Sequence, residues 1–255
     1  MKALEKEVMD ALRKGIGSND DYWSVEKTPV LLSSPLQGKR FYFLGSSVTI
    51  GFASGNEAVA DYIAKRNHCL CLKDAISGTT LRQKEKGDDS YVSRLQSGRI
   101  LRFGEKVDAF ICQLSTNDAW EVERYGKILP QGEGKMEDFD PSTTLGAIEY
   151  IIAFVRQKFA CPIFFYTGSF YQEMNGKNYA LLVQYLLQIA TEWSIHVIDL
   201  FSDPAFNAIN PKCYQYFMHD PIHPFKSGYR AWWTPEFEKA LSRSLKGKHV
   251  FPSSL

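Results

Sequence analysis

Short apolar runs typical of buried strands alternate with helical patterns along this chain from about residue 40 onward. The runs are bounded by glycine, proline, serine or aspartate, and they lie at residues 40–44, 68–72, 107–114, 162–167 and 195–200. Between them, apolar side chains recur every three or four positions in residues 145–159 and 181–193, as they do on one face of a helix. This alternation is typical of βαβ units, in which helices cover parallel strands. It predicts an α/β fold with a five-stranded parallel sheet.

Composition places the chain among globular proteins and excludes several partners. Its 255 residues are 44% hydrophobic, enough for one medium-sized domain with its own core. Thirty basic and 29 acidic residues give a net charge of +1, so there is no concentrated positive charge for nucleic acid or an anionic membrane surface. No stretch is long and apolar enough to span a bilayer, and the first fifteen residues are too charged for a secretory signal. The five cysteines form no C-x-x-C pair and suit reduced core thiols. We therefore expect a cytoplasmic protein.

Three parts of the chain are expected. They are an N-terminal helical extension over residues 1–35, a main domain over 36–245 and a C-terminal tail over 246–255. The extension carries one apolar helical face, formed by Leu4, Val8 and Leu12. This face either packs on the main domain or contacts a partner. The longest connection, residues 120–141, is rich in charged residues and glycine, and it is either a lid or a solvated excursion.

Polar residues follow four of the predicted strands. In parallel sheets the binding crevice lies beyond the carboxyl ends of the strands, so these positions are expected to meet. They are Gly45-Ser46-Ser47-Val48-Thr49, Ser77-Gly78-Thr79, Ser115-Thr116-Asn117-Asp118 and His219-Asp220-Pro221-Ile222-His223. A serine with a histidine and an aspartate can perform nucleophilic catalysis, and a glycine amide or an asparagine side chain can stabilise an oxyanion. The inventory is that of a hydrolase.

These four blocks, in this order, resemble those of the SGNH hydrolases, also called the GDSL esterase and lipase superfamily. That family carries a Gly-Asp-Ser block with a later threonine and glycine, a lone glycine, a Gly-x-Asn-Asp block and a terminal Asp-x-x-His. Gly45-Ser46-Ser47-Val48-Thr49 is similar to the first block, Gly78 to the second, Asn117 to the third, and Asp220 with His223 to the last. Ser46 replaces the family's aspartate, and Ser115 replaces the first glycine of the third block. The resemblance covers residues 40 to about 229.

The resemblance implies a three-layer α/β/α fold with a sheet of flavodoxin-like order, and a serine esterase. Ser47 would attack an acyl carbonyl, His223 would act as base and then as acid, and Asp220 would orient His223. The amides of Ser47 and Gly78, with the side chain of Asn117, would hold the oxyanion. No metal and no organic cofactor are implied. The implied partner is a small-molecule ester with a small or medium acyl group, an acetylated sugar among the candidates.

Other interpretations stay open at the level of sequence. The Gly45-Ser46-Ser47 stretch also suits a polar turn that caps a helix. His219 and His223 are four residues apart, the spacing of two metal ligands on a helix, but the intervening Pro221 argues against that helix. An acyltransferase would use the same serine, histidine and aspartate with an alcohol as acceptor. A non-catalytic flavodoxin-like binding module would keep the fold without the chemistry.

Overall fold

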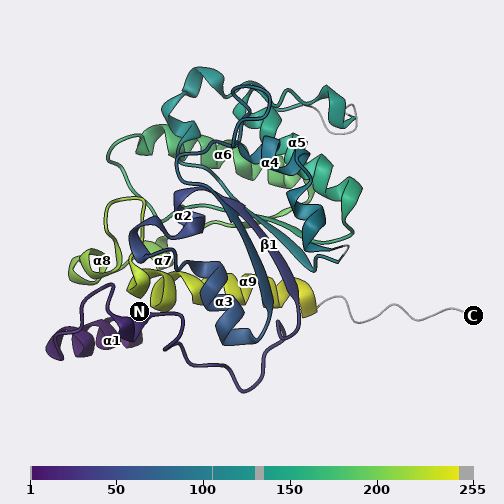
Figure 1. The fold of residues 1–255 in the computed structure, drawn as a ribbon. Helices are drawn as coiled ribbons and strands as arrows, with labels where there is room; N and C mark the ends of the chain where they lie inside the picture. The colour runs from purple at the N-terminus through teal and green to yellow at the C-terminus, as the bar shows by residue number, and fades with distance from the viewer. Residues whose placement is uncertain (1, 105, 130–134, 247–255) are drawn as a thin grey trace, which may run out of the picture.

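This computed structural model of the protein describes residues 2–104, 106–129 and 135–246. Five parallel strands form one sheet in the order β2-β1-β3-β4-β5 (Figure 1). They are β1 (Arg40–Gly45), β2 (Leu70–Ala75), β3 (Ala109–Gln113), β4 (Ile163–Tyr166) and β5 (His196–Ile198). The sheet confirms the predicted α/β fold and its flavodoxin-like strand order.

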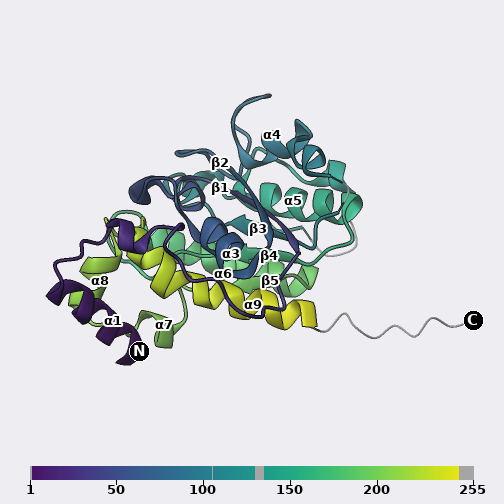
Figure 2. The same cartoon turned by 60° about the horizontal axis from the view of Figure 1, so that its bottom comes forward.

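Helices cover both faces of the sheet, which makes three layers. On one face lie α3 (Val59–Asn67) and α9 (Thr234–Lys246), and on the other lie α4 (Tyr91–Gln96), α5 (Thr144–Lys158) and α6 (Gly176–Trp193) (Figures 1 and 2). The other α-helices are α1 (Lys2–Arg13), α2 (Ser47–Ile50), α7 (Pro204–Asn207) and α8 (Pro211–Phe217). Single turns of 3₁₀-helix are η1 (Asp21–Trp23), η2 (Phe52–Ser54), η3 (Arg99–Phe103), η4 (Asp118–Trp120), η5 (Val122–Arg124) and η6 (Met136–Asp138), and η7 (Gly228–Trp233) is a π-helix that leads into α9.

Burial follows the position of each strand in the sheet. Every residue of β3 and β4 is buried, and so is β1 after Arg40. These are the central strands, whose two faces are both covered by helices, so their sequences are nearly continuous apolar runs. The edge strands β2 and β5 are only partly buried. The strongest sequence signals therefore came from the centre of the sheet.

Strand β2 is shifted relative to its prediction. The apolar run predicts residues 68–72, whereas the strand covers Leu70–Ala75. His68 ends α3 in a left-handed conformation with φ of 48°, so the strand cannot begin there. At its other end the strand includes Lys73 and Asp74, whose charges are paired with Asp61 and Arg94. Because Asp61 and Arg94 neutralise them from outside the strand, Lys73 and Asp74 can lie in this edge strand.

The N-terminal helix α1 packs on the domain beside α8 (Figure 1). Val8 and Ala11 are buried and Leu4 is partly buried, but Leu12 is 44% exposed. The buried face is thus rotated from the predicted Leu4, Val8 and Leu12 stripe toward Ala11. The following segment is anchored by Trp23, whose indole donates to the Tyr216 hydroxyl at 2.9 Å.

The long connection over residues 120–141 lies against α5 and α6 where the structure describes it. The Tyr125 hydroxyl donates to the Asn178 carbonyl at 2.9 Å, and the Phe139 ring lies 5.5 Å from that of Trp193. Residues 130–134 of this connection and residues 247–255 of the predicted tail lie outside the described residues. Within the described chain, no helix has the length and hydropathy needed to cross a membrane.

Candidate active site

The four polar blocks lie on the side of the sheet where the strands end, and direct contacts join the first block to the fourth and the second to the third. Ser47 is the first residue of α2, two residues after β1 ends. Gly78 and Asn117 lie in the loops that follow β2 and β3. The fourth block, which carries Asp220 and His223, is a turn after α8, closed by an antiparallel bridge between Met218 and Pro224.

A continuous chain of hydrogen bonds joins Ser47, His223 and Asp220. The Ser47 Oγ lies 2.8 Å from His223 Nε2. On the other side of the ring, His223 Nδ1 lies 2.8 Å from one carboxylate oxygen of Asp220 and 3.0 Å from the other. An imidazole held in this way carries its proton on Nδ1 and presents a lone pair from Nε2 to the hydroxyl. The arrangement can therefore take a proton from Ser47.

The Asp220 carboxylate is fixed by its own turn. The backbone amides of Ile222 and His223 each donate to its Oδ1 at 2.8 Å. Partial burial raises the pKa of the Asp220 carboxyl, but the hydrogen bonds from the His223 ring and the two amides outweigh this, and the pKa lies below its ordinary value. Asp220 is thus an anion beside the imidazole at neutral pH, and a carboxylate in this position favours a protonated ring.

Ser46 faces away from this chain of hydrogen bonds. Its side chain is fully buried and its hydroxyl accepts from the side-chain amide of Gln113 at 3.1 Å. The Gln113 oxygen accepts from the Ser46 amide and from the Thr49 hydroxyl, at 2.9 and 2.7 Å. Gly45 is required by this packing, since a Cβ there would lie 1.6 Å from Thr49 Oγ1. Gln113, a residue that the sequence prediction did not single out, therefore holds the turn that positions Ser47.

Three hydrogen-bond donors that the sequence pointed to lie on neighbouring loops. The Ser47 amide is the first of a helix, where N–H groups have no intrahelical acceptor. Gly78 has a left-handed φ of 80°, which glycine adopts without strain, and no described residue accepts from its amide. The Asn117 side-chain nitrogen donates to the Thr79 carbonyl at 2.9 Å, and its second N–H remains available.

Asp118 ties the second and third loops together, a role that the sequence did not reveal. Its carboxylate is fully buried and accepts from the Leu81 amide at 2.8 Å and the Thr144 hydroxyl at 3.1 Å. Burial raises the pKa of this carboxyl to about 6, although its hydrogen bonds act in the opposite direction. The side chains of Asn117 and Asp118 thus both contact the loop after β2.

Other residues weighed from the sequence lie apart from this chain of hydrogen bonds. The His219 ring packs edge-on against Phe225 at 5.4 Å, and its amide donates to the His223 carbonyl. His196 stacks on Phe164. In the described chain, no cluster of three histidine, cysteine, aspartate or glutamate side chains could hold a metal ion.

An exposed aromatic ring lies beside His223, and a cavity opens between the loops that lead to the site. Phe52, which the sequence did not single out, is 59% exposed and its ring lies 5.3 Å from that of His223. A cavity of about 420 Å³ opens between the loop after β4 and the segment that precedes the His223 turn. Its walls include the rings of Phe170, Tyr171 and Tyr214 and the polar side chains of Gln172 and Glu173. Phe170 and Tyr171, which lie in the loop after β4, line this cavity.

A family model described as the GDSL-like Lipase/Acylhydrolase family matches residues 43–231, a span that contains all four polar blocks. The chain belongs to this family. It is accordingly an SGNH-type hydrolase, related to lipases and esterases. No curated protein matches the sequence.

Solved structures of low sequence identity share the fold. A member of the lipolytic protein G-D-S-L family from Veillonella parvula has a TM-score of 0.58 and 13% identity, over 81% of this chain and all (100%) of that one. An acetylxylan esterase from Geobacillus stearothermophilus has a TM-score of 0.55 and 17% identity, over 80% of this chain and 94% of that one. A protein from Lactobacillus plantarum has a TM-score of 0.58 and 18% identity, over 84% of this chain and 99% of that one. The likeness to all three is a likeness of fold.

Proposed function

We propose that this hydrolase is a serine esterase that cleaves small or medium acyl esters, with O-acetyl groups on carbohydrate as one substrate class. The observation that carries the proposal is the 2.8 Å contact between Ser47 Oγ and His223 Nε2, with Asp220 bound to the opposite ring nitrogen. A hydroxyl is a poor nucleophile until an adjacent base removes its proton, and this contact supplies the base.

In the first half of the reaction, Ser47 Oγ bonds to the acyl carbon while its proton passes to His223 Nε2. Asp220 stabilises the resulting imidazolium and keeps the ring oriented. The bond from the acyl carbon to the alcohol oxygen then breaks, and the alcohol leaves with the proton from His223. The acyl group remains on Ser47 as an ester.

In the second half, a water molecule gives a proton to His223 and adds to the same acyl carbon. The bond to Ser47 Oγ breaks, the serine regains its proton, and the free acid leaves. Both halves pass through a tetrahedral species whose oxygen carries negative charge. We assign its stabilisation to the amides of Ser47 and Gly78 and the free N–H of Asn117, since such donors act most strongly on charge that develops in the transition state.

The carbohydrate part of the proposal is supported by the cavity beside the site. A polyhydroxylated alcohol group can pack on aromatic faces and bond to amide and carboxylate side chains. This cavity offers both, from Phe170, Tyr214, Gln172 and Glu173. Tyr214 lies on α8, the helix that leads into the turn with Asp220 and His223. The cavity is therefore near the hydrogen-bonded chain.

Hydrolysis of p-nitrophenyl esters of graded chain length tests the proposal directly. We expect wild-type protein to prefer short acyl chains and Ser47→Ala to be inactive on all of them. Turnover should persist after exhaustive chelation with EDTA. Activity that survives in Ser47→Ala would exclude the proposed nucleophile. Added alcohols that yield new esters faster than water yields acid would identify an acyltransferase instead.

A further inference from the structure

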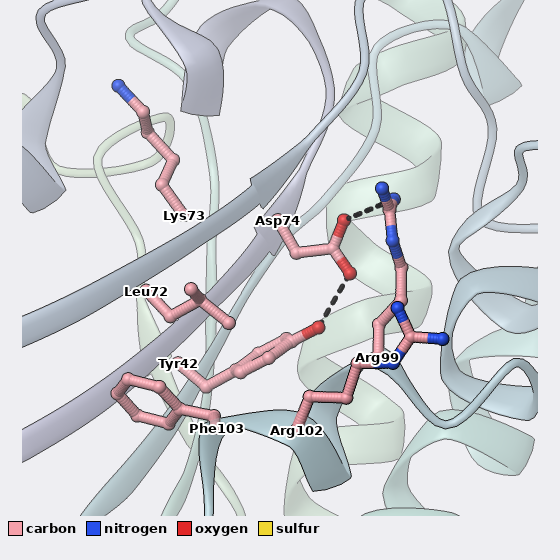
Figure 3. A pocket seen from close by; sticks show the side chains of 7 residues that line it. All are labelled: Tyr42, Leu72, Lys73, Asp74, Arg99, Arg102 and Phe103. Atoms are coloured by element: carbon pink, nitrogen blue, oxygen red, sulfur yellow. Dashed lines mark hydrogen bonds and ion pairs between the residues drawn. The ribbon is translucent and has the colours of Figure 1, made fainter.

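A second cavity of about 290 Å³ lies on the face of the sheet at its β2 edge, and it shares no lining residue with the proposed active site. Its walls come from β1, β2 and the 3₁₀-helix η3 (Figure 3). The side chains that matter here are those of Tyr42, Leu72, Asp74, Arg99, Arg102 and Phe103. Its volume is at the small end of the range for ligand pockets.

The floor of this cavity is a carboxylate that already accepts hydrogen bonds from three side chains. Asp74 Oδ1 accepts from Arg94 at 2.9 Å and from Arg99 at 3.1 Å, and Oδ2 accepts from the Tyr42 hydroxyl at 2.6 Å. The Asp74 side chain is only 5% exposed, and that of Arg94 is 3% exposed. The buried Arg94 therefore neutralises Asp74, and a visiting ligand would meet its neighbours rather than the carboxylate.

The guanidinium groups of Arg99 and Arg102 on the rim carry more positive charge than the described residues around them neutralise. Arg99 shares Asp74 with Arg94, and its side chain is 47% exposed. Arg102 is exposed and has no hydrogen-bond or ion-pair partner among the described residues. Residues three apart eclipse one another on a 3₁₀-helix, and Figure 3 shows both guanidinium groups on the same side of the cavity. A pair of forked N–H donors at this spacing suits an oxyanion.

The opposite wall is apolar and partly aromatic. Leu72 and the Phe103 ring face the cavity, and the Phe103 ring lies edge-on to Tyr42 at 6.2 Å. The Arg40 guanidinium covers the Phe103 ring at 4.5 Å and adds a further positive charge at this edge. Arg40 bonds to backbone carbonyls of Phe103 and Lys106, which do not neutralise it.

We propose that this cavity binds a small organic oxyanion, a carboxylate or a phosphate that carries a flat apolar group. Arg99 and Arg102 would bind the oxyanion, and Leu72 and Phe103 would contact the apolar group. The proposal does not rest on esterase activity, since none of these side chains belongs to the proposed catalytic machinery.

Calorimetric titration at low salt tests this site with four probes: benzoate, phenyl phosphate, acetate and inorganic phosphate. We expect benzoate or phenyl phosphate to bind at least about tenfold more tightly than acetate or inorganic phosphate, because only the former reach the apolar wall. Arg102→Gln should weaken binding at least about tenfold, since a charge-assisted hydrogen bond is lost. Arg243→Gln, which alters an exposed arginine on α9, should leave affinity unchanged and serves as the matched control.

Arg102→Gln should also leave ester hydrolysis and the melting temperature unchanged, so a loss of binding cannot be assigned to unfolding. A carboxylate can additionally enter the site at Ser47 as a product analogue. Benzoate that binds wild-type protein and Arg102→Gln equally well would place it there, and would overturn the proposal. Failure of all four probes to bind would overturn it as well. Equal affinity for acetate and benzoate would overturn the assignment of the apolar group to Leu72 and Phe103.

Discussion

The guanidinium of Arg94 donates a 2.8 Å hydrogen bond to the carbonyl of Gly45, two residues before Ser47. The same side chain bonds to the Asp74 carboxylate and backbone carbonyl, at 2.9 and 2.8 Å. Its Nη2 also lies 3.5 Å from the hydroxyl of Thr79, the residue after Gly78. One buried arginine on α4 thus joins the ends of β1 and β2, from which two of the proposed oxyanion donors follow.

We therefore predict that Arg94→Met lowers both stability and turnover. Removal of one member of a buried ion pair costs about 3–5 kcal/mol, because the other charge stays buried without its partner. Since Arg99 still contacts Asp74, we expect the lower end of this range. Turnover should fall by up to about 10²-fold with a smaller change in KM, as a displaced catalytic group would cause. Urea unfolding and steady-state kinetics of the same preparation measure the two effects.

Arg94→Lys separates the two contributions of this side chain. Lysine keeps the positive charge beside Asp74 but cannot span Asp74 and Gly45 with one planar fork. Stability should recover in part, while turnover stays low. If Arg94→Lys restores turnover and stability in equal measure, then charge compensation alone explains the role of Arg94.

The two adjacent serines should respond differently to alanine. Ser47→Ala should abolish hydrolysis and labelling by a fluorophosphonate, with no loss of folding. Ser46→Ala should keep turnover but lose about 1–2 kcal/mol, because the buried side-chain amide of Gln113 loses its acceptor. Mass spectrometry of the labelled protein locates the adduct, and an adduct on Ser46 would reverse the assignment.

Much of this site could be predicted because parallel strands end at a common edge. Residues distant in sequence, such as Ser47 and Gly78, are brought together by the strand order alone. The apolar runs of β1, β3 and β4 are buried on both faces, so they were recognisable without further information. Asp220 and His223 are three residues apart in a single turn, so their side chains could be expected to lie close together.

The supporting residues could not be predicted because their partners are far along the chain. Gln113 contacts Ser46 across 67 residues, Asp118 contacts Leu81 across 37, and Arg94 contacts Gly45 across 49. Nothing in the local sequence distinguishes a polar residue with such a partner from one that faces solvent. For the same reason the predicted strand ends at residue 72 and omits the charged end of β2, where Asp74 is compensated by Arg94 on α4.

Asp220→Asn should show that Asp220 has two separate roles. One is to orient His223, which kcat at neutral pH reports, and the other is to stabilise the fold, which the pH dependence of the unfolding free energy reports. At neutral pH we expect kcat to fall by about 10³–10⁴-fold, as in other serine-histidine-aspartate sites, because asparagine favours the wrong imidazole tautomer. The pKa of Asp220 is lowered on folding, so the carboxylate stabilises the native state above its ordinary value of 3.8, and this contribution is lost as pH falls through the lowered pKa.

Unfolding free energies at pH 7 and pH 3 check the sign of this effect. Wild-type protein should exceed Asp220→Asn in stability at pH 7, and the gap should narrow at pH 3. A gap that widens in acid would mean that folding raises the pKa of Asp220. A kcat of Asp220→Asn near the wild-type value would show that the two turn amides and the histidine ring need no carboxylate between them.

Asn117 presents the sharpest choice between a chemical and a structural role, because its side chain already holds the loop after β2. The Asn117 Nδ2 donates to the Thr79 carbonyl at 2.9 Å, and its backbone amide donates to the Ser115 hydroxyl at 3.1 Å. If the second N–H of the side chain binds the oxyanion, Asn117→Ala should lower kcat by about 10²–10³-fold, or roughly 3–4 kcal/mol in the activation barrier. KM should change much less, since the bond strengthens only as charge develops.

The contact with Thr79 predicts a separate and smaller loss in unfolding free energy, on the order of 1 kcal/mol. Thr79 Oγ1 donates to the Ile76 carbonyl and also contacts Arg94, so Thr79→Ala disturbs the same loop without removing the proposed oxyanion donor. This variant is the matched control, and it should lose stability comparable to Asn117→Ala while it keeps most of its turnover. If instead both variants lose kcat in proportion to their loss of stability, or if Asn117→Ala loses less than about tenfold in kcat, Asn117 organises its loop and binds no oxyanion.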